Sequence, residues 1–381
     1  MSFYSLTTHW AWRLTTVIFL CLLVSLALIQ PRALVARAGG ITRPGELIEL
    51  RAGPPGPPSR IGPPTSLAHP QQGASPASAT FLVTYNGFSA PAQAAFQAAV
   101  NIWATQISSP VPIRVNATWT TLGTGVLGSA SAHTLLRDFP GAPMPGTWYP
   151  SALANKLAET DLDPGAVDID ANFNSTFANW YYGADGHPSA TQYDLMTVVL
   201  HELGHGLGFV GTATYSLGKG SWGLGSGFPA IYDRQVVNGS NQALINTSLF
   251  PNNTTTLGSQ LTSNNLFLNG AYTVAAAGGK PRLYVPSTWQ QGSSYAHLDE
   301  STYPVGNPNS LMTPQLGKGE AILNPGPITL GLFADMGWAQ QSTATATPTS
   351  SPSATPTVTR TPTTTPGNAL KPRMFLPAVH S

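Results

Sequence analysis

Two stretches of the chain alternate apolar and polar residues, a pattern typical of half-buried β-strands. They cover residues 113–119 and 167–173, and the apolar run at residues 81–85 indicates a further strand ahead of them. After that first strand, Ser89 is placed to cap a helix with apolar residues at helical spacing, namely Phe96, Val100, Trp103 and Ile107. The chain therefore begins its folded part as strand, helix, strand, strand.

A second helix is predicted to begin near Ser189, and a short last helix is predicted to start at Pro327 and to cover residues 328–336. Trp338 is the last residue expected in the core. Residues 212–295 are rich in Gly, Ser and Asn with few helical signals, so they are expected to be a long insertion of loops and short strands. This order predicts an α+β domain at residues 80–340, with a twisted mixed sheet that carries helices and a loop-rich C-terminal subdomain.

The two ends of the chain differ in composition from this domain. Residues 14–29 are apolar and uncharged, and Ala36-Arg37-Ala38 resembles a cleavage site, so residues 1–38 are predicted to be a signal peptide rather than a membrane anchor. Residues 39–79 are predicted to be a disordered, Pro/Gly-rich linker or pro-segment. Residues 341–368 have the Thr/Pro/Ser composition of a stalk, and residues 369–381 form a short tail. We therefore expect a secreted or cell-surface protein, retained at the surface through the stalk and tail and not stably inserted in a membrane.

The charge and the cysteine content of the chain exclude some classes of partner and of metal ligand. Charged residues make up 9% of the 381 residues, and the formal net charge is +1, so no basic surface for nucleic acid is expected. The only cysteine, Cys21, lies within the predicted signal peptide. The mature chain would then have neither disulfides nor thiolate ligands, so core packing must stabilise it, with or without a contribution from a metal.

The helix predicted near Ser189 contains the pattern H-E-x-x-H. His201 and His205 are four residues apart, so both imidazoles lie on one helix face, and Glu202 stands beside them as a candidate general base. The apolar residues of the helix lie on its other side. This arrangement indicates a zinc site, because zinc with three protein ligands retains a position for a reactive water. The chain has no G-x-S-x-G sequence that would indicate a serine nucleophile.

The third ligand is not where the longer metzincin pattern H-E-x-x-H-x-x-G-x-x-H would have it, because Gly211 occupies that position. Gly208 is present and is expected to end the helix and turn the chain back. His297 is the histidine downstream of this turn and is the favoured third ligand, since imidazole suits zinc. Asp233 and Asp299 remain alternatives, because carboxylates can complete a zinc site.

A zinc helix with H-E-x-x-H-x-x-G-F, a long insertion, a lone histidine and then Leu311-Met312-Thr313-Pro314 resembles the leishmanolysin-like branch of the metzincin metalloproteases. The resemblance implies a metzincin-like fold and a zinc endopeptidase acting on polypeptides. It also implies that His201, His205 and His297 bind one Zn²⁺, that Glu202 is the base, and that Met312 forms the Met-turn. The chain lacks that family's cysteine framework, so the likeness is to a cysteine-free, bacterial-type relative. It further implies that the strand at 168–174 is the sheet edge to which substrates add as a strand.

Other functions and other metals are compatible with parts of this pattern. The main alternative is a non-catalytic surface adhesion or binding module with a structural metal site, and a zinc amidase would share the chemistry but not the substrate. A cluster of acidic residues suggests a structural Ca²⁺, although solvated strand faces explain it equally well. These residues are Asp161, Asp163, Asp168, Asp170 and Asp185.

Overall fold

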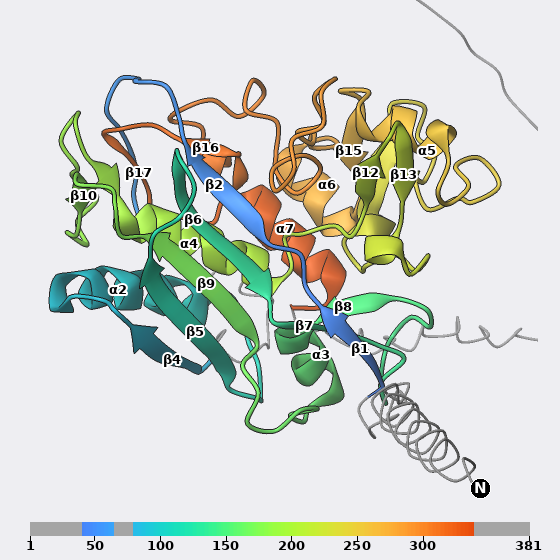
Figure 1. Ribbon diagram of the computed structural model, residues 1–381, viewed down its shortest axis with the longest axis horizontal. Coiled ribbons are helices and arrows are strands. Elements are labelled where there is room, and N and C mark those ends of the chain that lie inside the picture. Colours follow the sequence, from blue (N-terminus) through green and yellow to red (C-terminus); the bar gives the residue numbers. More distant parts are fainter. Residues whose placement is uncertain (1–39, 65–78, 339–381) are drawn as a thin grey trace, which may run out of the picture. The chain divides into compact units, whose positions relative to one another are not determined.

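A six-stranded mixed sheet forms the centre of the computed structural model, which describes residues 40–64 and 79–338 (Figure 1). The predicted signal peptide, stalk and tail lie outside the described residues. The strands, in spatial order, are β16 (Gln315–Leu316), β2 (Ile48–Ala52), β6 (Val126–Ala132), β9 (Ile169–Asn174), β5 (Ile113–Thr120) and β4 (Phe81–Asn86). β4, β5 and β9 are parallel, β6 is antiparallel to β9, β2 is antiparallel to β6, and β16 is parallel to β2. The predicted mixed sheet is thus present, with the three predicted strands in it.

The alternation in the sequence corresponds to burial in the sheet. Ile113, Val115 and Ala117 of β5 are buried while the residues between them are half-buried, and β9 begins with the same alternation. β4 and β5 are parallel, which requires a crossover, and helix α2 (Ala90–Gln106) supplies it. The hydroxyl of Ser89 accepts a hydrogen bond from the backbone N–H of Ala92, as a helix cap should. This part of the fold is confirmed.

Helix α4 (Leu195–Leu207) carries the H-E-x-x-H residues and packs on β2, β6 and β9, with α2 beside it (Figure 1). It begins later than the sequence predicts, because Asp194 and not Ser189 is its cap. The carboxylate of Asp194 accepts a hydrogen bond from the backbone N–H of Thr197 at 2.8 Å. The residues just before it form β11 (Tyr193–Asp194), which pairs with β10 (Trp180–Tyr181).

The prediction that residues 39–79 are disordered is wrong for residues 40–64. This segment forms β1 (Ile41–Pro44), which pairs with β7 (Thr134–Arg137), then β2 of the central sheet, and then β3 (Ser59–Ile61), which pairs with β17 (Glu320–Ile322). Ile48 and Leu50 are buried, so two apolar side chains at strand spacing join the core despite the local composition. The Pro/Gly run lies at residues 53–58, which connect β2 to β3.

The prediction that residues 168–174 form the edge of the sheet is also wrong. β9 lies in the interior of the sheet, between β6 and β5. The chain continues from β5 into β6, which adds antiparallel on the far side of β9, and β2 and β16 then extend the sheet beyond β6. Strand order depends on long-range pairing, which the alternation of residues within one strand does not report.

The insertion at residues 212–295 contains short strands, as expected, and also two helices that its composition did not predict. The strands are β12 (Thr214–Ser216), β13 (Lys219–Ser221), β14 (Val236–Asn238) and β15 (Leu266–Leu268), and the helices are α5 (Thr255–Leu261) and α6 (Ala271–Ala277). Thr254 caps α5 through its side chain. Before the insertion lie β8 (Trp148–Pro150) and α3 (Ser151–Ala158).

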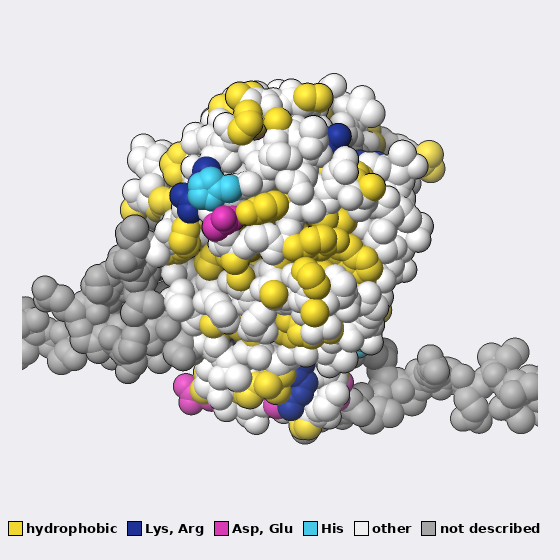
Figure 2. All heavy atoms as spheres, turned by 90° about the vertical axis from the view of Figure 1, so that its left-hand side faces the viewer, with side chains coloured by type: hydrophobic (Ala, Val, Ile, Leu, Met, Phe, Trp, Pro, Cys, Tyr) yellow, Lys and Arg dark blue, Asp and Glu magenta, His cyan; other side chains and the backbone are white. Residues whose placement is uncertain are grey.

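The C-terminal part of the domain follows the prediction. Helix α7 (Pro327–Met336) ends at Gly337, and Trp338 is buried with its indole N–H donating to the carbonyl oxygen of Leu207 at 2.9 Å. None of the described helices is long and apolar enough to cross a membrane. On the face shown in Figure 2, charged side chains are few and apolar side chains are scattered among uncharged polar ones.

Candidate metal centre

Three histidine side chains meet at one point in the described structure. His201 and His205 project from α4, and His297 reaches them from the segment just after the insertion. The Nε2 atom of His205 lies 2.9 Å from that of His201 and 3.2 Å from that of His297, and the third pair is 3.3 Å apart. Within the described ranges, these three histidines are the one group of three or more His, Cys, Asp or Glu side chains whose ligand atoms lie close enough together to hold a metal ion.

Each imidazole is held by a hydrogen bond on its outer nitrogen. The Nδ1 atoms of His201, His205 and His297 lie 2.5, 2.7 and 2.7 Å from the backbone carbonyl oxygens of Leu311, Phe209 and Ser293, respectively. A carbonyl oxygen only accepts, so each Nδ1 must carry the proton. The Nε2 lone pairs are therefore turned towards one another, which is the arrangement of ligands around a metal.

The three nitrogens fit a tetrahedral zinc ion. Zinc–nitrogen bonds of about 2.0–2.1 Å in tetrahedral geometry separate neighbouring nitrogens by about 3.3 Å. All three histidines are fully buried, and burial lowers the pKa of His297 to about 4 and the pKa values of the other two well below the usual value. The imidazoles are therefore neutral at neutral pH, the protonation state that binds metal. Three lone pairs in close contact also repel one another unless a cation lies between them.

The turn after α4 supplies the backbone carbonyl group that holds the His205 imidazole in place. Gly208 has φ 125° and ends the helix, as predicted, and its neighbour Phe209 donates its backbone N–H to the carbonyl oxygen of Gly204. The reversal brings the carbonyl oxygen of Phe209 back to Nδ1 of His205. A side chain at Gly208 would be strained at this φ.

The turn that contains Met312 lies beneath α4 and holds two of the ligands. A Cβ atom on Gly204 would lie 2.9 Å from the sulfur of Met312, so this glycine allows the methionine to approach the helix. Leu311 accepts the hydrogen bond from His201, and the carbonyl oxygen of Met312 accepts one from the backbone N–H of Leu298, next to His297. Met312 therefore lies against the helix that carries His201 and His205, and its turn also contacts the residue next to His297.

Gly211 cannot carry the third ligand because there is no room for a side chain. A Cβ atom there would lie 2.1 Å from the ring of Tyr295 and 2.7 Å from Oδ1 of Asp233. Asp233 itself accepts hydrogen bonds from the backbone N–H groups of Thr212 and Ala230 and from the Thr212 hydroxyl. Its carboxylate therefore fixes the loop after α4 and does not join the histidine cluster.

Asp299, the other alternative ligand, is likewise committed elsewhere. Its Oδ1 accepts hydrogen bonds from the hydroxyls of Ser301 and Thr302 and from the backbone N–H of Thr302, which closes a turn just after His297. The structure therefore brings His297, and neither aspartate, to the two helix histidines.

Glu202 lies beside the histidines with one carboxylate oxygen engaged. Oε1 accepts a hydrogen bond from the backbone N–H of Leu50 at 3.1 Å, and Oε2 is buried without a hydrogen-bond partner among the described residues. Burial raises the pKa of Glu202 well above its usual value, while the hydrogen bond from Leu50 opposes this shift.

Two residues that shape this site were missed in the sequence. Gly128 of β6 faces the helix, and a Cβ atom there would lie 3.0 Å from the side chain of Glu202, so the glycine makes space for the carboxylate. Leu50 contacts Glu202 through its backbone alone. Neither contact has a signal in the local sequence, because a backbone N–H is common to nearly every residue type and the partners are far apart along the chain.

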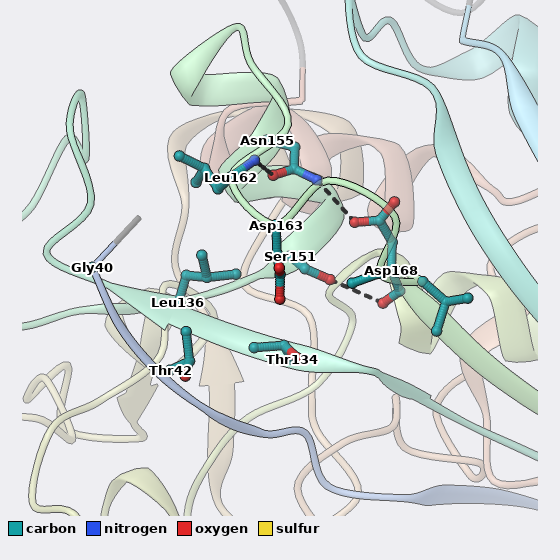
Figure 3. A pocket seen from close by; sticks show the side chains of 11 residues that line it. Gly40, Thr42, Thr134, Leu136, Ser151, Asn155, Leu162, Asp163 and Asp168 are labelled. Atoms are coloured by element: carbon teal, nitrogen blue, oxygen red, sulfur yellow. Dashed lines mark hydrogen bonds between the residues drawn. The ribbon is translucent and has the colours of Figure 1, made fainter. Parts of the chain in front are cut away.

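The carboxylates of the acidic cluster do not converge as the three histidines do in the described residues. Asp168 accepts hydrogen bonds on its carboxylate from Asn155, as Figure 3 shows, and from the backbone N–H of Arg114. Asp170 pairs with His133 at 2.6 Å. No three of the cluster's carboxylates come together at ligand distance where the chain is described. A structural Ca²⁺ at this cluster stays a prediction.

Comparison with known proteins adds one partial match. A family described as SPBPB7E8-like matches residues 146–224, which include α4 and the turn at Gly208 but neither His297 nor Met312. The match covers well under half of the chain. No curated protein and no solved structure matches the sequence.

Proposed function

We propose that this protein is a secreted or surface-displayed zinc endopeptidase of metzincin type. The observation that carries the proposal is the convergence of three neutral imidazole nitrogens at 2.9–3.3 Å, with the carboxylate of Glu202 on the adjacent helix position. His201, His205 and His297 would hold the ion. The metzincin likeness is supported by the glycine that ends the helix and by Met312 beneath it.

Different residues of the chain would have different roles in peptide hydrolysis. A bound zinc ion lowers the pKa of a water molecule and polarises the substrate carbonyl. The Oε2 atom of Glu202, which lacks a partner among the described residues, takes the proton of the attacking water and returns it to the leaving amine. The carbonyl groups of Leu311, Phe209 and Ser293 keep the imidazoles in the required tautomer.

One observation favours the competing reading, a binding module with a structural metal. His201, Glu202, His205 and His297 all have an exposed fraction of 0%, so the site is closed in this structure. A structural zinc site, however, is completed by four protein ligands, and the described residues supply three. A carboxylate with an unpaired buried oxygen next to the ligands also costs stability without helping a structural ion.

Zinc removal and restoration test the proposal. The full chain is assayed on denatured casein with zinc bound, after a chelator, and after zinc is returned. We expect one zinc per chain and cleavage that is lost and regained with the metal. Zinc that raises the Tm of the chain without any cleavage of casein or of a peptide library would instead identify a binding module.

A further inference from the structure

Strand β4 forms one margin of the central sheet, and its outer edge pairs with no strand among the described residues (Figure 1). It has six residues, whereas β16 at the opposite margin has two and so exposes few backbone groups. β4 pairs with β5 along its whole length without a shift of register, so no bulge turns its edge away. The margin at β4 is therefore the long and regular edge of this sheet.

Every second residue of β4 points its backbone groups to this open edge. The carbonyl oxygen of Thr80, just before the strand, accepts a hydrogen bond from the backbone N–H of Ile113 in β5. Because the direction of these groups alternates along a strand, the even-numbered residues of β4 turn their N–H and C=O groups to β5. Those of Phe81, Val83 and Tyr85 point the other way, where no described strand faces them. Each of these three residues therefore has a donor and an acceptor for another strand.

Neutral residues form and border this open edge. Residues 79–112, which include β4 and α2, contain no Asp, Glu, Lys, Arg or His, and β4 contains no proline. Gln97 of α2 lies beside the strand, because its Oε1 accepts a hydrogen bond from the Tyr85 hydroxyl at 3.3 Å, and its amide group donates to Asn101. Charges, prolines and bulges are the usual features that keep sheet edges apart. This stretch has none of them, so no like charge on it repels a second copy of the same edge.

The edge is complementary to itself in one antiparallel register. With Val83 opposite Val83 of a second copy, Phe81 lies opposite Tyr85 and Leu82 lies opposite Thr84. Residues whose backbone groups point outward then face one another, as hydrogen-bonded pairs of an antiparallel ladder must. The half-buried residues that pack against the core, Phe81, Val83 and Tyr85, also meet each other on one face, and the exposed Leu82 and Thr84 meet on the other. A shift by one residue would pair half-buried with exposed positions.

We propose that two copies of this chain associate through β4 in this register, so that their central sheets join into one continuous sheet about a twofold axis at Val83. Such an interface uses the same surface on both copies, as is usual for symmetric dimers. Self-pairing is favoured over a strand from another protein because the edge matches itself in charge, burial and hydrogen-bonding direction. The inference is independent of the proposed zinc chemistry, since β4 carries none of the clustered histidines.

Sedimentation velocity of the full chain over a series of concentrations tests the association. We expect a monomer that converts to a dimer as the concentration rises. Thr84→Lys puts a charge on the exposed face of the edge, opposite Leu82 of the other copy, and is expected to raise the dissociation constant by about 10-fold. Thr256→Lys, the same change at an exposed residue of α5, is the matched control and should leave the constant unchanged. Near-UV circular dichroism checks that both variants are folded.

Disulfide trapping tests the register. Leu82→Cys and Thr84→Cys are made separately in a Cys21→Ser background, which removes the only other cysteine, and are mixed under mild oxidation. The proposed register makes residues 82 and 84 of the two copies a non-hydrogen-bonded pair, with Cα atoms about 4.5 Å apart and within reach of a disulfide. The same residue in both copies lies too far apart, more than about 7 Å. The mixed disulfide is therefore expected to form at least about 10-fold faster than either same-site disulfide.

Several results would overturn the inference. A chain that stays monomeric at every concentration does so, including one that instead binds a synthetic peptide of residues 79–88, which would assign the edge to an extended segment of another protein. A dimer that Thr84→Lys weakens no more than Thr256→Lys would place the contact elsewhere on the molecule. Same-site disulfides at residue 84 that form faster than the mixed ones would contradict the register. None of these results depends on zinc content or casein cleavage, so they leave the proposed function to its own test.

Discussion

The Nε2 atoms of His205 and His297 lie 3.2 Å apart, although 92 residues separate the two histidines in the chain. His205 is set by the helix and its glycine turn, and His297 is set by the carbonyl oxygen of Ser293 and by the turn that contains Met312. Two separate parts of the fold thus bring the Nε2 lone pairs of these two histidines to one point. Such convergence of fully buried bases is costly without a cation between them.

His297→Ala is expected to weaken zinc binding by roughly 100-fold or more, because one of three ligands is lost. Asp233→Asn is the matched comparison, since Asp233 is equally buried but accepts its hydrogen bonds from Thr212 and Ala230 and not from the histidines. It should lose stability by about 1–3 kcal/mol and retain zinc affinity. Competition with a fluorescent chelator measures both affinities. Retained binding in His297→Ala together with loss in Asp233→Asn would reverse the ligand assignment.

A histidine at position 211 is not expected to replace His297. In a His297→Ala background, Gly211→His would place its Cβ atom against the Tyr295 ring, within 2.1 Å, and against Asp233. We expect no recovery of zinc affinity and a further loss of stability of about 1–3 kcal/mol from overpacking. Chelator competition and thermal unfolding check the two parts. Recovery of zinc affinity to the wild-type level would mean that the loop is not held as described.

Gly206→Ala is expected to destabilise the protein by about 1–3 kcal/mol, even though alanine favours helices. The added Cβ atom would lie 2.4 Å from the buried side chain of Ile169 in β9. Combining it with Ile169→Ala should remove most of the clash. Gly279→Ala is the control, because nothing lies within 4 Å of its Cβ position. Urea unfolding of the four proteins would contradict the account if Gly206→Ala were as stable as Gly279→Ala.

The metal-free protein is expected to lose stability in acid partly through His297. Burial lowers its pKa from 6.5 to about 4, so the unfolded chain binds the proton more readily than the folded one. The stabilising contribution is complete above pH 6.5 and is lost as the pH falls to 4, amounting to about 3 kcal/mol.

His297→Gln lacks this titration, and it also removes the charge of His297, which adds to the effect of burial in lowering the pKa values of His201 and His205. The stability of the wild type relative to His297→Gln should therefore fall between pH 6.5 and 4 in denaturant unfolding. Parallel pH profiles for the two proteins would show that the imidazole is not buried in a neutral state.

The sequence predicted the helices and strands in which apolar residues recur at a regular spacing along one segment. The alternation around Val115 and the helical spacing from Phe96 to Trp103 each report one buried face, and both elements are present. The spacing of His201 and His205 likewise defines one helix face. Gly208 was recognised because a helix end with positive φ favours glycine.

The missed parts depend on pairing between distant segments. Ile48 and Leu50 are only two apolar residues near a Pro/Gly run, and their strand exists because β6 and β16 pair with it. The interior position of β9 follows from β6 adding beyond it. The room that Gly128 makes for Glu202 likewise appears only when strand and helix are packed together. Composition averaged over a stretch does not report such contacts.

The most direct test of the central claim compares wild type with Glu202→Gln at matched zinc content. The variant keeps the three histidines but removes the atom that accepts the proton, so kcat/KM for a peptide substrate should fall by roughly 10²–10⁴-fold with zinc affinity unchanged. Equal hydrolysis by the two proteins, or no hydrolysis by zinc-loaded wild type, would contradict the account.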